Sequence, residues 1–447
     1  MTTNEQVLQL LKKKQFGAAK ELLVTMNVID LAAFLSDAET ETMLLLFRIL
    51  PKRLAADTFA FLSGTSQKYI ISSFSDAEVS NLLRELFVDD VADLVEEVPA
   101  NIASKILKNA NENTRAAVNQ ILQYPKDSAG SILTTEYVRF KKSMTVSEAL
   151  SRIRAKGIKS ETIYTCYVTD DNRILEGFVS LKNLVLADGN ERIENIYTAD
   201  CISVNTHDDR ESVALLFKKY GFLALPVVDN EKRLVGIITV DDIMDVMEAE
   251  TTEDFQKMAA VSPSEERYLE TSVFTLAKNR IFWLLLLMFT ETFTGGIIEH
   301  FTEVLEQCVI LTAFIPVLMD TGGNSGSQAT TLIIRGLATD DLHTKDIAKV
   351  IWKEFRIGFF VSVILGGFMF IKNFFISRKD LYVSLTVSLA IILTVIIAKV
   401  MGAFLPMIAK KLHLDAATMA PPVLTTIVDT VSLLVYFTFA KIFIPGL

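Results

Sequence analysis

The stretch YVTDDNRILEGFVS at residues 167–180 is repeated as PVVDNEKRLVGIIT at residues 226–239, an offset of 59 positions. In each copy, two apolar runs flank a turn of Asp, Asn and charged residues, which is the pattern of a β-hairpin. Each copy ends on Ser or Thr, residues that commonly begin a helix. Helices are also predicted before the two copies, at residues 146–156 and 210–220. The middle of the chain is therefore predicted to be a duplicated α/β module.

Residues 5–130, upstream of this module, indicate helices alone. Apolar side chains recur there at spacings of three and four, which is typical of amphipathic helices. The clearest run is Leu82, Leu83, Leu86, Phe87, Val91, Leu94, Val95 and Val98. Pro51 and Pro99 each predict the start of a new short helix. Short helices stacked in pairs favour an all-α superhelical domain.

The C-terminal part of the chain is apolar enough to cross a membrane several times. A hydrocarbon core about 30 Å thick needs about 20 helical residues per crossing. Five spans are predicted, at residues 281–301, 306–335, 351–376, 381–411 and 416–444. The second and fifth are interrupted by Pro, Gly or polar residues, which is tolerated only where the backbone faces protein or water. We therefore expect a five-helix α transmembrane domain in which these two helices adjoin a path.

Charge is distributed unevenly along the chain. Residues 1–270 contain 42 acidic and 30 basic residues, whereas residues 271–447 contain 12 acidic and 14 basic residues. An acidic soluble part attracts cations and repels nucleic acid, so no nucleic-acid partner is expected. Basic residues flank the spans mainly on one side, which predicts a multi-pass plasma (inner) membrane protein. Its N-terminus would be cytoplasmic and its C-terminus outside.

The sequence carries no motif that indicates an enzyme. HExxH, P-loop and GxSxG patterns are absent, and the four histidines are dispersed. Three scattered cysteines have no metal-binding spacing and favour free thiols in a reducing compartment. These observations exclude the common hydrolase and zinc-enzyme classes and leave transport or sensing as the classes to consider.

Asp429 is the most informative single residue. It lies inside the last predicted span without a basic residue nearby in sequence. A carboxylate at bilayer depth costs about 2.5–3.5 kcal/mol or more unless it faces water, a cation or a partner. We therefore interpret Asp429 as a cation-binding pore residue, with Thr425 and Thr426 contributing hydroxyl or carbonyl oxygens. The alternative is a protonated, hydrogen-bonded Asp with a structural role.

The second span has a composition that suits either a pore lining or close helix packing. Its segment PVLMDTGGNSGSQ, residues 316–328, combines three glycines with Asn, Ser and Gln. Small residues let helices approach closely, and both roles can hold together. The candidate pore-lining residues are Gly322, Gly323, Asn324, Gly326 and Gln328.

Acidic residues of the soluble part are candidates for binding divalent ions. Asp89 and Asp93 are four residues apart and share a helix face, where like charges repel unless a cation lies between them. Taken alone, such a pair is usually a solvated surface. Further acids follow the duplicated module at Asp242, Asp245, Glu250, Glu253 and Asp254. Divalent ions could draw these carboxylates together, and their removal would let them separate.

The chain resembles the MgtE family of magnesium channels and transporters over nearly its whole length. The resemblance rests on YPKDSAG at residues 124–130, the duplicated module, TTED at 251–254, the segment 316–338 and TTIVD at 425–429. It implies a homodimer in the lipid bilayer, and it identifies the duplicated module as a tandem pair of CBS domains. The domains would be a helical magnesium-sensing domain (1–130), CBS 1 (131–198), CBS 2 (199–247), a connecting plug helix (248–279) and the transmembrane domain (280–447).

The resemblance also assigns roles to individual residues. Asp429 matches the family's pore aspartate, which meets its symmetry mate around a hydrated Mg²⁺. The cytosolic magnesium-sensing carboxylates would be Asp57, Asp89, Asp93, Glu211, Asp242, Asp245, Glu250, Glu253 and Asp254. CBS pairs commonly bind adenine nucleotides. The chain departs from the family pattern at Gly221, at 420–422 (Ala-Pro-Pro) and at Ala416 after Asp415.

These inferences lead to one expected function and two alternatives. We expect Mg²⁺ uptake down its electrochemical gradient, shut off when cytosolic Mg²⁺ bridges the helical domain, the CBS pair and the plug helix. The first alternative is a secondary-active exchanger that couples divalent cations to H⁺ or Na⁺. The second is a membrane-tethered nucleotide sensor whose spans are anchors only, which would leave Asp429 and the Gly-rich span unexplained.

Overall fold

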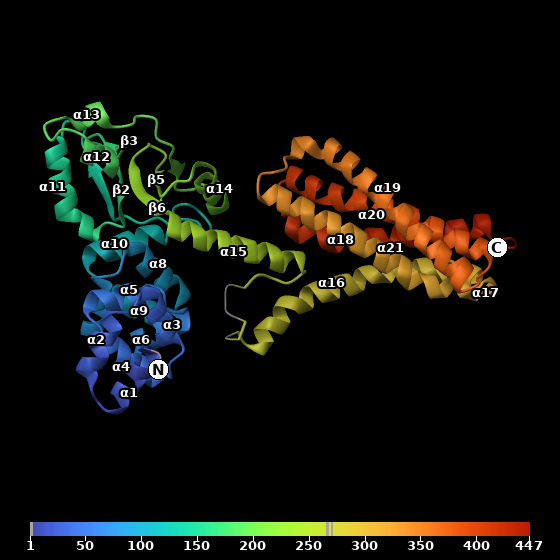
Figure 1. Cartoon of the computed structure of the whole chain (residues 1–447), viewed down its shortest axis with the longest axis horizontal. Helices are drawn as coiled ribbons and strands as arrows, with labels where there is room; N and C mark the ends of the chain where they lie inside the picture. Colours follow the sequence, from blue (N-terminus) through green and yellow to red (C-terminus); the bar gives the residue numbers. More distant parts are fainter. Residues whose placement is uncertain (1–2, 265–267, 270) are drawn as a thin grey trace. The chain divides into compact units, whose positions relative to one another are not determined.

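The computed structural model describes residues 3–264, 268–269 and 271–447, which form two compact units, Met1–Met247 and Glu248–Leu447. Within the described residues, the first unit begins with ten short helices (Figure 1). They are α1 (Thr3–Lys12), α2 (Phe16–Val24), α3 (Val28–Ser36), α4 (Thr40–Ile49), α5 (Lys52–Ala60), α6 (Gly64–Ser73), α7 (Asp76–Leu83), α8 (Val88–Glu97), α9 (Ala100–Asn109) and α10 (Glu112–Ile121). The all-α N-terminal domain is confirmed.

Local capping explains where these short helices begin. Pro51 and Pro99 directly precede α5 and α9, as the sequence predicts. At α7, the Ser75 N–H donates to the Glu78 carboxylate at 2.8 Å and the Glu78 N–H donates to the Ser75 hydroxyl at 3.3 Å. This capping box satisfies two N–H groups that a helix start leaves without partners. The apolar residues of the 82–98 run are buried, apart from Phe87, which is half-buried.

The duplicated module forms two three-stranded sheets of the same topology. The first contains β1 (Tyr137–Phe140), β2 (Thr162–Thr169) and β3 (Leu175–Ser180), and the second contains β4 (Val204–Asn205), β5 (Ala224–Val228) and β6 (Leu234–Thr239). In each sheet the first pair of strands is parallel and the second pair antiparallel. Its helices are α11 (Val146–Lys156), α12 (Leu181–Leu186), α13 (Ile193–Ile196), α14 (Arg210–Tyr220) and α15 (Val240–Met258). The tandem CBS pair is confirmed.

The two copies share a hairpin turn, and the turns join the copies. The Asp170 carboxylate accepts a hydrogen bond from the Ile174 N–H, and the Asp229 carboxylate accepts one from the Arg233 N–H, 59 positions later. The backbone then pairs across the copies: the N–H of Leu175 donates to the Lys232 carbonyl at 3.0 Å, and the N–H of Leu234 donates to the Arg173 carbonyl at 2.9 Å. The two copies of the repeat are thus joined by equivalent hydrogen bonds in both directions.

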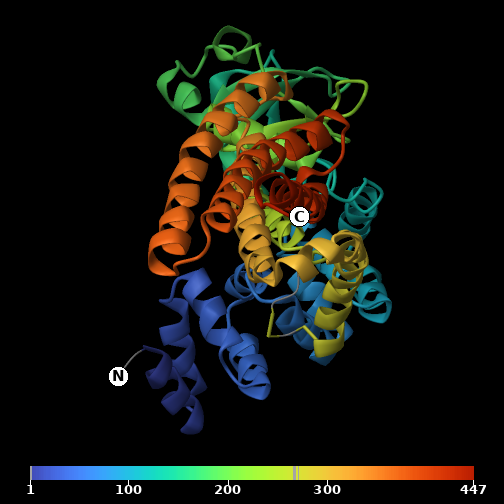
Figure 2. The ribbon, with the colours of Figure 1, turned by 90° about the vertical axis from the view of Figure 1, so that its right-hand side faces the viewer.

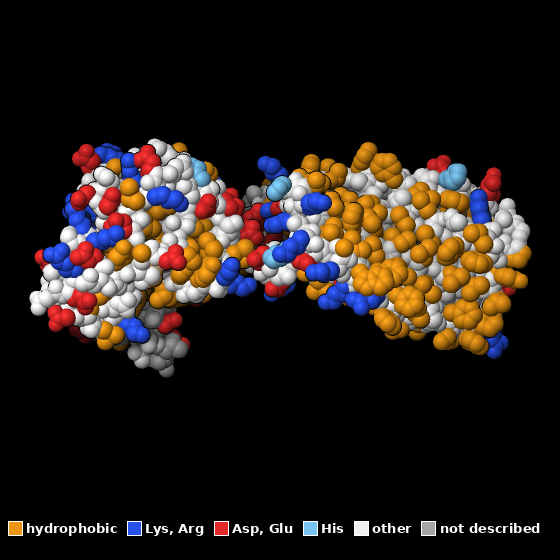
Figure 3. Space-filling view, turned by 90° about the horizontal axis from the view of Figure 1, so that it is seen from above, with side chains coloured by type: hydrophobic (Ala, Val, Ile, Leu, Met, Phe, Trp, Pro, Cys, Tyr) orange, Lys and Arg blue, Asp and Glu red, His pale blue; other side chains and the backbone are white. Residues whose placement is uncertain are grey.

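The second unit is a helical bundle (Figures 1 and 2). Its helices are α16 (Val273–His300), α17 (Thr302–Gln307), α18 (Ile315–Ala338), α19 (Ile347–Ile371), α20 (Leu381–Lys411) and α21 (Ala416–Phe443). Hydrophobic side chains cover most of the face of this unit that Figure 3 presents, and Lys and Arg gather mainly at one of its ends. Such an apolar exterior is that of a membrane domain.

Four helical segments of the described residues are long and apolar enough to cross a membrane: Val273–His300, Thr344–Ile376, Leu381–Lys411 and Ala416–Phe443. They correspond to the first, third, fourth and fifth predicted spans. The second predicted span, 306–335, differs, because α17 and a 3₁₀ turn at 309–314 precede α18. Pro316 lies in the first turn of α18, a position that favours a helix start. Length and composition support the first, third, fourth and fifth predicted spans, and the second stays a prediction.

The predicted plug helix at 248–279 is only partly helical. Helix α15 ends at Met258, and Ala260 then adopts a left-handed conformation with φ of 55°, which is incompatible with continuing the helix. Helix α16 begins after Ser272, whose hydroxyl accepts from the Thr275 N–H at 3.1 Å. Residues 265–267 and 270 of this predicted segment lie outside the described residues.

Candidate functional sites

Glycines of α18 allow it to pack closely against α20 and α21. A Cβ placed on Gly322 would lie 2.8 Å from side-chain carbons of Thr394 and Val428, and one on Gly402 would lie 2.4 Å from the Gly326 carbonyl oxygen. Contacts this short leave no room for a methyl group. Gly322 and Gly326 therefore serve helix packing. By contrast, Asn324 and Gln328 are exposed, and Gly323 has open space beside it, so these three remain available to line a path.

Asp429 is buried on α21, with 9% of its surface exposed. Leu424 and Val428 on the same helix pack against Ala398 of α20. Among the described residues, Asp429 has no hydrogen bond or ion pair. The charge that acts on it electrostatically is Glu291 on α16, and this interaction is repulsive. An acid held in this way lacks the compensation that a structural buried carboxylate requires.

The hydroxyls beside Asp429 have partners within α21. Thr425 and Thr426 both donate to the Pro422 carbonyl, at 3.0 and 3.3 Å. Proline has no N–H, so Pro421 and Pro422 remove two helix hydrogen bonds, yet α21 continues through both. The hydroxyl protons of Thr425 and Thr426 are used in hydrogen bonds within this turn. The lone pairs of both hydroxyl oxygens remain able to face an ion's water shell.

A second polar group of the bundle surrounds Lys399 on α20, which is 5% exposed. Its ammonium donates to the Gln328 side-chain oxygen at 2.9 Å. Glu354 on α19 is also buried and attracts Lys399 electrostatically. These residues come from three helices, so nothing in the sequence alone connects them.

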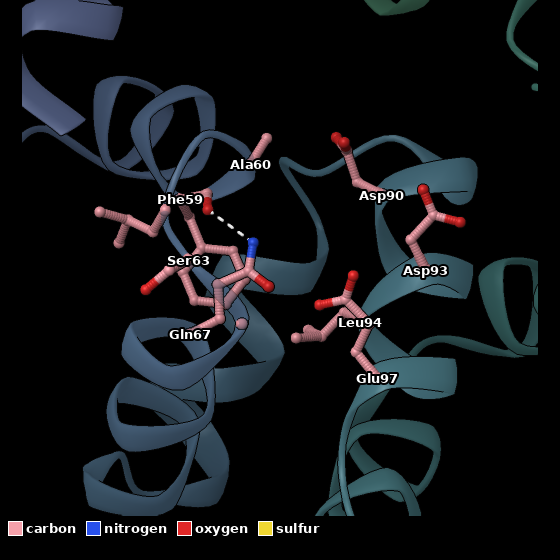
Figure 4. Close-up of a pocket in the computed structure, with 10 residues that line it drawn as sticks. Phe59, Ala60, Ser63, Gln67, Asp90, Asp93, Leu94 and Glu97 are labelled. Carbon is pink, nitrogen blue, oxygen red and sulfur yellow. Dashed lines mark hydrogen bonds between the residues drawn. The ribbon is translucent and has the colours of Figure 1, made fainter. Parts of the chain in front are cut away.

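The first unit brings Asp89, Asp93 and Asp242 together. Loss of hydration is the largest influence on each of them, and it raises the pKa of Asp242 to about 6 and that of Asp93 to about 7. Repulsion from Asp242 adds to both Asp89 and Asp93, and the pKa of Asp89 lies well above its usual range. The Asp93 side chain, which projects from α8 (Figure 4), nevertheless keeps contact with solvent. Desolvated carboxylates that repel one another favour the binding of a cation that neutralises them.

The structure adds four acids that sequence analysis missed: Asp90, Glu136, Glu161 and Asp241. Desolvation and mutual repulsion raise the pKa of Asp90 to about 6 and that of Glu161 to about 8. One oxygen of Glu161 is fully buried without a hydrogen-bond partner. Asp90 and Asp241 adjoin predicted residues in sequence, whereas only the fold brings Glu136 and Glu161 near α8 and α15.

The remaining predicted sensing acids of the first unit are more dispersed. Asp57 is exposed on α5, and desolvation raises its pKa despite the opposing charge of Arg53. Glu211 lies in the first turn of α14, and Asp245 is exposed on α15. Gly221, where the family resemblance leads us to expect an acid, ends α14 with φ of 66°. That left-handed conformation favours glycine and explains the departure.

In the second unit, the end of α15 carries Glu250, Glu253 and Asp254. Lys257 bridges two carboxylates there, Glu253 at 2.5 Å and Asp415 at 2.7 Å. Asp415 also caps α21 by accepting from the Ala417 and Thr418 N–H groups. Desolvation and then repulsion from Asp415 raise the pKa of Asp254. A lysine thus already neutralises part of the predicted plug acids.

Within the described residues, no three Asp, Glu, His or Cys side chains converge closely enough to hold a metal ion. The acidic groups around α8 and at the end of α15 therefore do not form chelating sites in this structure. Direct chelation of an ion would require their carboxylates to move closer together.

A domain of stacked helices, a tandem CBS pair and a membrane-type bundle with a buried acid define the class as a membrane transport protein that carries CBS domains. Family profiles agree: "Divalent cation transporter" (MgtE) matches residues 315–439, "MgtE intracellular N domain" matches 26–127, and "CBS domain" matches 129–190 and 193–249. The chain is 35% identical over 442 residues to "Magnesium transporter MgtE" of Thermus thermophilus, covering 98% of both chains. It is 30% identical over 433 residues to the Bacillus subtilis protein of that name, covering 94% of this chain and 95% of the relative. The chain belongs to the MgtE family of magnesium transporters.

Two solved structures resemble the soluble part. One is the cytosolic domain of the Mg²⁺ channel MgtE in complex with ATP, with 35% identity and a TM-score of 0.52, covering 54% of this chain and 99% of the other. The other is the soluble part of a magnesium transporter, with 29% identity and a TM-score of 0.53, covering 56% and 98%. Both agree with the helical domain and CBS pair described above.

Proposed function

We propose that this chain takes up Mg²⁺ down its electrochemical gradient through a pore formed by a homodimer. The observation that carries the proposal is Asp429, a buried acid without a base or hydrogen-bond donor among the described residues. A two-fold axis beside α21 would bring two copies of this carboxylate to one divalent ion. Repulsion from Glu291 further increases the local demand for positive charge.

The chemistry of Mg²⁺ suits a site with so few ligands. Mg²⁺ gives up its water shell reluctantly and is often held through its waters by one or two carboxylates. One Asp from each protomer could recognise the hydrated ion, assisted by Asn324 on α18. A potential of 100 mV contributes about 2.3 kcal/mol per charge, hence about 4.6 kcal/mol for a divalent ion. Uptake then needs no ATPase.

Cytosolic Mg²⁺ is proposed to close the pore. The assembled acids are Asp89, Asp93 and Asp242 in the first unit, and Glu250, Glu253 and Asp254 at the end of α15. Raised pKa values of Asp93 and Asp242 support the view that these acids are held in mutual repulsion when no cation is bound. Mg²⁺ would favour the compact state because it binds that state more tightly, and this difference in affinity drives the change.

We also propose an adenine nucleotide as a ligand of the CBS pair, supported by the relative solved with ATP. The orientation with a cytoplasmic N-terminus rests on the basic residues that flank the spans. It would place both acidic groups in the compartment whose Mg²⁺ they are proposed to sense.

The test is Mg²⁺ flux into liposomes that contain the full chain. Asp429→Ala is expected to reduce uptake at least tenfold while the protein remains folded. Glu306→Gln is the matched control, because it removes a charge from an exposed position on α17. Normal flux through Asp429→Ala would refute the pore assignment. Flux that depends on a proton gradient would favour the exchanger instead.

A further inference from the structure

Glu291 is an exposed carboxylate in the middle of a membrane-spanning helix. It lies on α16, about 16 Å along the helix from Arg280 at about 1.5 Å per residue. A hydrocarbon core is about 30 Å thick, so this carboxylate is near the centre of the span. It has no hydrogen bond or ion pair among the described residues. A carboxylate at this depth is tolerated where it meets water, a cation or a partner.

A second polar group on α16 also lacks a partner. Thr294 is the one buried residue of this helix within the described residues, with 3% of its surface exposed. Its hydroxyl oxygen is fully buried without a hydrogen-bond partner. The neighbouring hydroxyls differ, because Thr290 and Thr292 donate to backbone carbonyls of their own helix, at 2.8 and 2.6 Å. A buried hydroxyl normally has a partner, so one is missing at Thr294.

The side of α16 that carries both groups faces α21. Residues 291, 294, 298 and 301 are spaced by three and four, so they follow one side of the helix. Ile298 and Phe301 pack against the apolar core that contains Phe437 of α21. The rings of Phe301 and Phe437 are stacked, with centroids 4.7 Å apart. The Thr294 hydroxyl and the Glu291 carboxylate, one turn apart, therefore belong to the side that meets the helix of Asp429.

The stacked rings also set the register of the two helices, which run in the same direction (Figure 1). At about 1.5 Å per residue, Thr294 lies about 10 Å and Glu291 about 15 Å before Phe301. Along α21, Asp429 lies about 12 Å before Phe437. Asp429 is therefore level with the turn of α16 that carries the other two groups. The electrostatic repulsion between Glu291 and Asp429 agrees with this register.

We propose that Glu291, Asp429 and the Thr294 hydroxyl oxygen form one cation site within each protomer, and that it binds the transported Mg²⁺ with its water shell. Two carboxylates supply the charge that neutralises a divalent ion, and Mg²⁺ is often held through its waters by one or two carboxylates. The Thr294 oxygen can accept a hydrogen bond from those waters. This inference rests on the proposed transport function and extends it, because the second carboxylate comes from α16 of the same protomer.

The experiment measures Mg²⁺ uptake into liposomes that contain the full chain, over a range of external Mg²⁺ concentrations. Glu291→Gln is expected to raise the concentration for half-maximal uptake at least fivefold, because it removes one of two charges. Glu291→Asp keeps the charge and should raise it less. Thr294→Val keeps the shape of the side chain, and should raise it at least threefold without lowering the melting temperature. Glu299→Gln, at an exposed position near the end of α16, is the control and should change it less than twofold.

A chemical test separates the effect of charge at position 291 from an effect on folding. In a chain whose three native cysteines are replaced by Ala, Glu291→Cys is treated with one of two methanethiosulfonate reagents. The sulfonatoethyl reagent restores a negative charge, and the methyl reagent does not. Uptake at low Mg²⁺ should recover at least threefold with the first reagent alone. Both reagents act on the same folded protein, so the comparison decides the question even if a substitution weakens the fold.

The site is refuted if Glu291→Gln leaves the half-maximal concentration unchanged, or if Glu299→Gln raises it equally. Recovery with both reagents, or with neither, has the same consequence. These results leave the pore assignment in place as long as Asp429→Ala abolishes uptake. Normal uptake by Asp429→Ala, in contrast, refutes the proposed function and this site with it.

Discussion

At the scale of single residues, the acids around α8 predict a pH-dependent response to Mg²⁺. Asp90, Asp93 and Asp242 have pKa values of about 6 to 7 in the folded protein, against 3.8 for an ordinary Asp. Between pH 4 and 7 the folded state therefore binds more protons than the unfolded state, so stability falls as pH rises through this range. Mg²⁺ should restore this stability at higher pH, because it neutralises the carboxylates that have lost their protons.

The measurement is the melting temperature of the full chain, with EDTA and with Mg²⁺, at pH 5.5 and 7.5. Stabilisation by Mg²⁺ is expected to be several degrees larger at pH 7.5. The double variant Asp93→Asn, Asp242→Asn should flatten the pH dependence without Mg²⁺. A Mg²⁺ effect that is equal at both pH values would contradict this account.

Residues differ in how far the sequence alone predicts their role. Asp429 is predictable because an acid within an apolar span is conspicuous without any tertiary information. Glu161 is not, since it lies just before β2 and joins the acidic group only when the fold brings this segment near Asp90 and Asp242, which are far away in sequence. The packing role of Gly322 similarly depends on Thr394 and Val428, which lie on other helices.

At the scale of elements, helix contacts in the bundle predict the effect of enlarging a glycine. Gly402→Ala on α20 would place a Cβ 2.4 Å from the Gly326 carbonyl of α18, which is backbone and cannot move aside. We expect a loss of about 1–3 kcal/mol in stability, typical of overpacking, seen as a lower melting temperature in detergent. Gly367→Ala on α19 is the control, because nothing lies within 4 Å of its Cβ. Equal effects of the two substitutions would contradict close α18–α20 packing.

The end of α15 predicts a role for Lys257 in gating. Lys257→Gln removes the only cation that bridges Glu253 and Asp415 among the described residues, so these carboxylates repel more strongly. Partly exposed pairs contribute up to about 1 kcal/mol. This repulsion opposes the compact state in which the pore is proposed to be shut. The cytosolic Mg²⁺ concentration that halves liposome flux should therefore rise up to about fivefold. Lys345→Gln, exposed in the α18–α19 loop, should leave it unchanged; a fall with Lys257→Gln would reject the idea.

Element boundaries follow from the sequence where local chemistry sets them. The bounds of α11, α14 and α20 coincide with the predicted ranges, because caps and apolar periodicity agree there. The predicted start of the second span, residue 306, is nine residues before the start of α18 at Ile315. The apolar run from 306 continues through α17 and a 3₁₀ turn before α18 begins. Apolar composition alone cannot distinguish these turns from a continuous helix.

At the scale of the whole molecule, the helices of the second unit differ in how far they are buried, which bears on the proposed homodimer. Only 6% of the apolar stretch of α16 is buried, against 56% for α20. Lipid can cover such a surface, but Asp429 is buried with neither a base nor a hydrogen-bond donor among the described residues, so the proposed pore must supply its neighbour. A symmetric partner is the simplest source, because identical residues meet at a two-fold axis.

A two-fold axis beside α21 would place two copies of residue 429 within reach of one hydrated ion. In a chain whose Cys166, Cys201 and Cys308 are replaced by Ala, Asp429→Cys should be linked to its symmetry mate by a bifunctional maleimide whose spacer is about as long as a hydrated ion is wide, because a disulfide would require the two Cα atoms to lie within about 7 Å. The product should be a covalently linked dimer on gels. Phe360→Cys, 68% exposed on α19, is the control and should not cross-link. Efficient cross-linking at 360 with none at 429 would move the two-fold axis away from α21, and the pore with it.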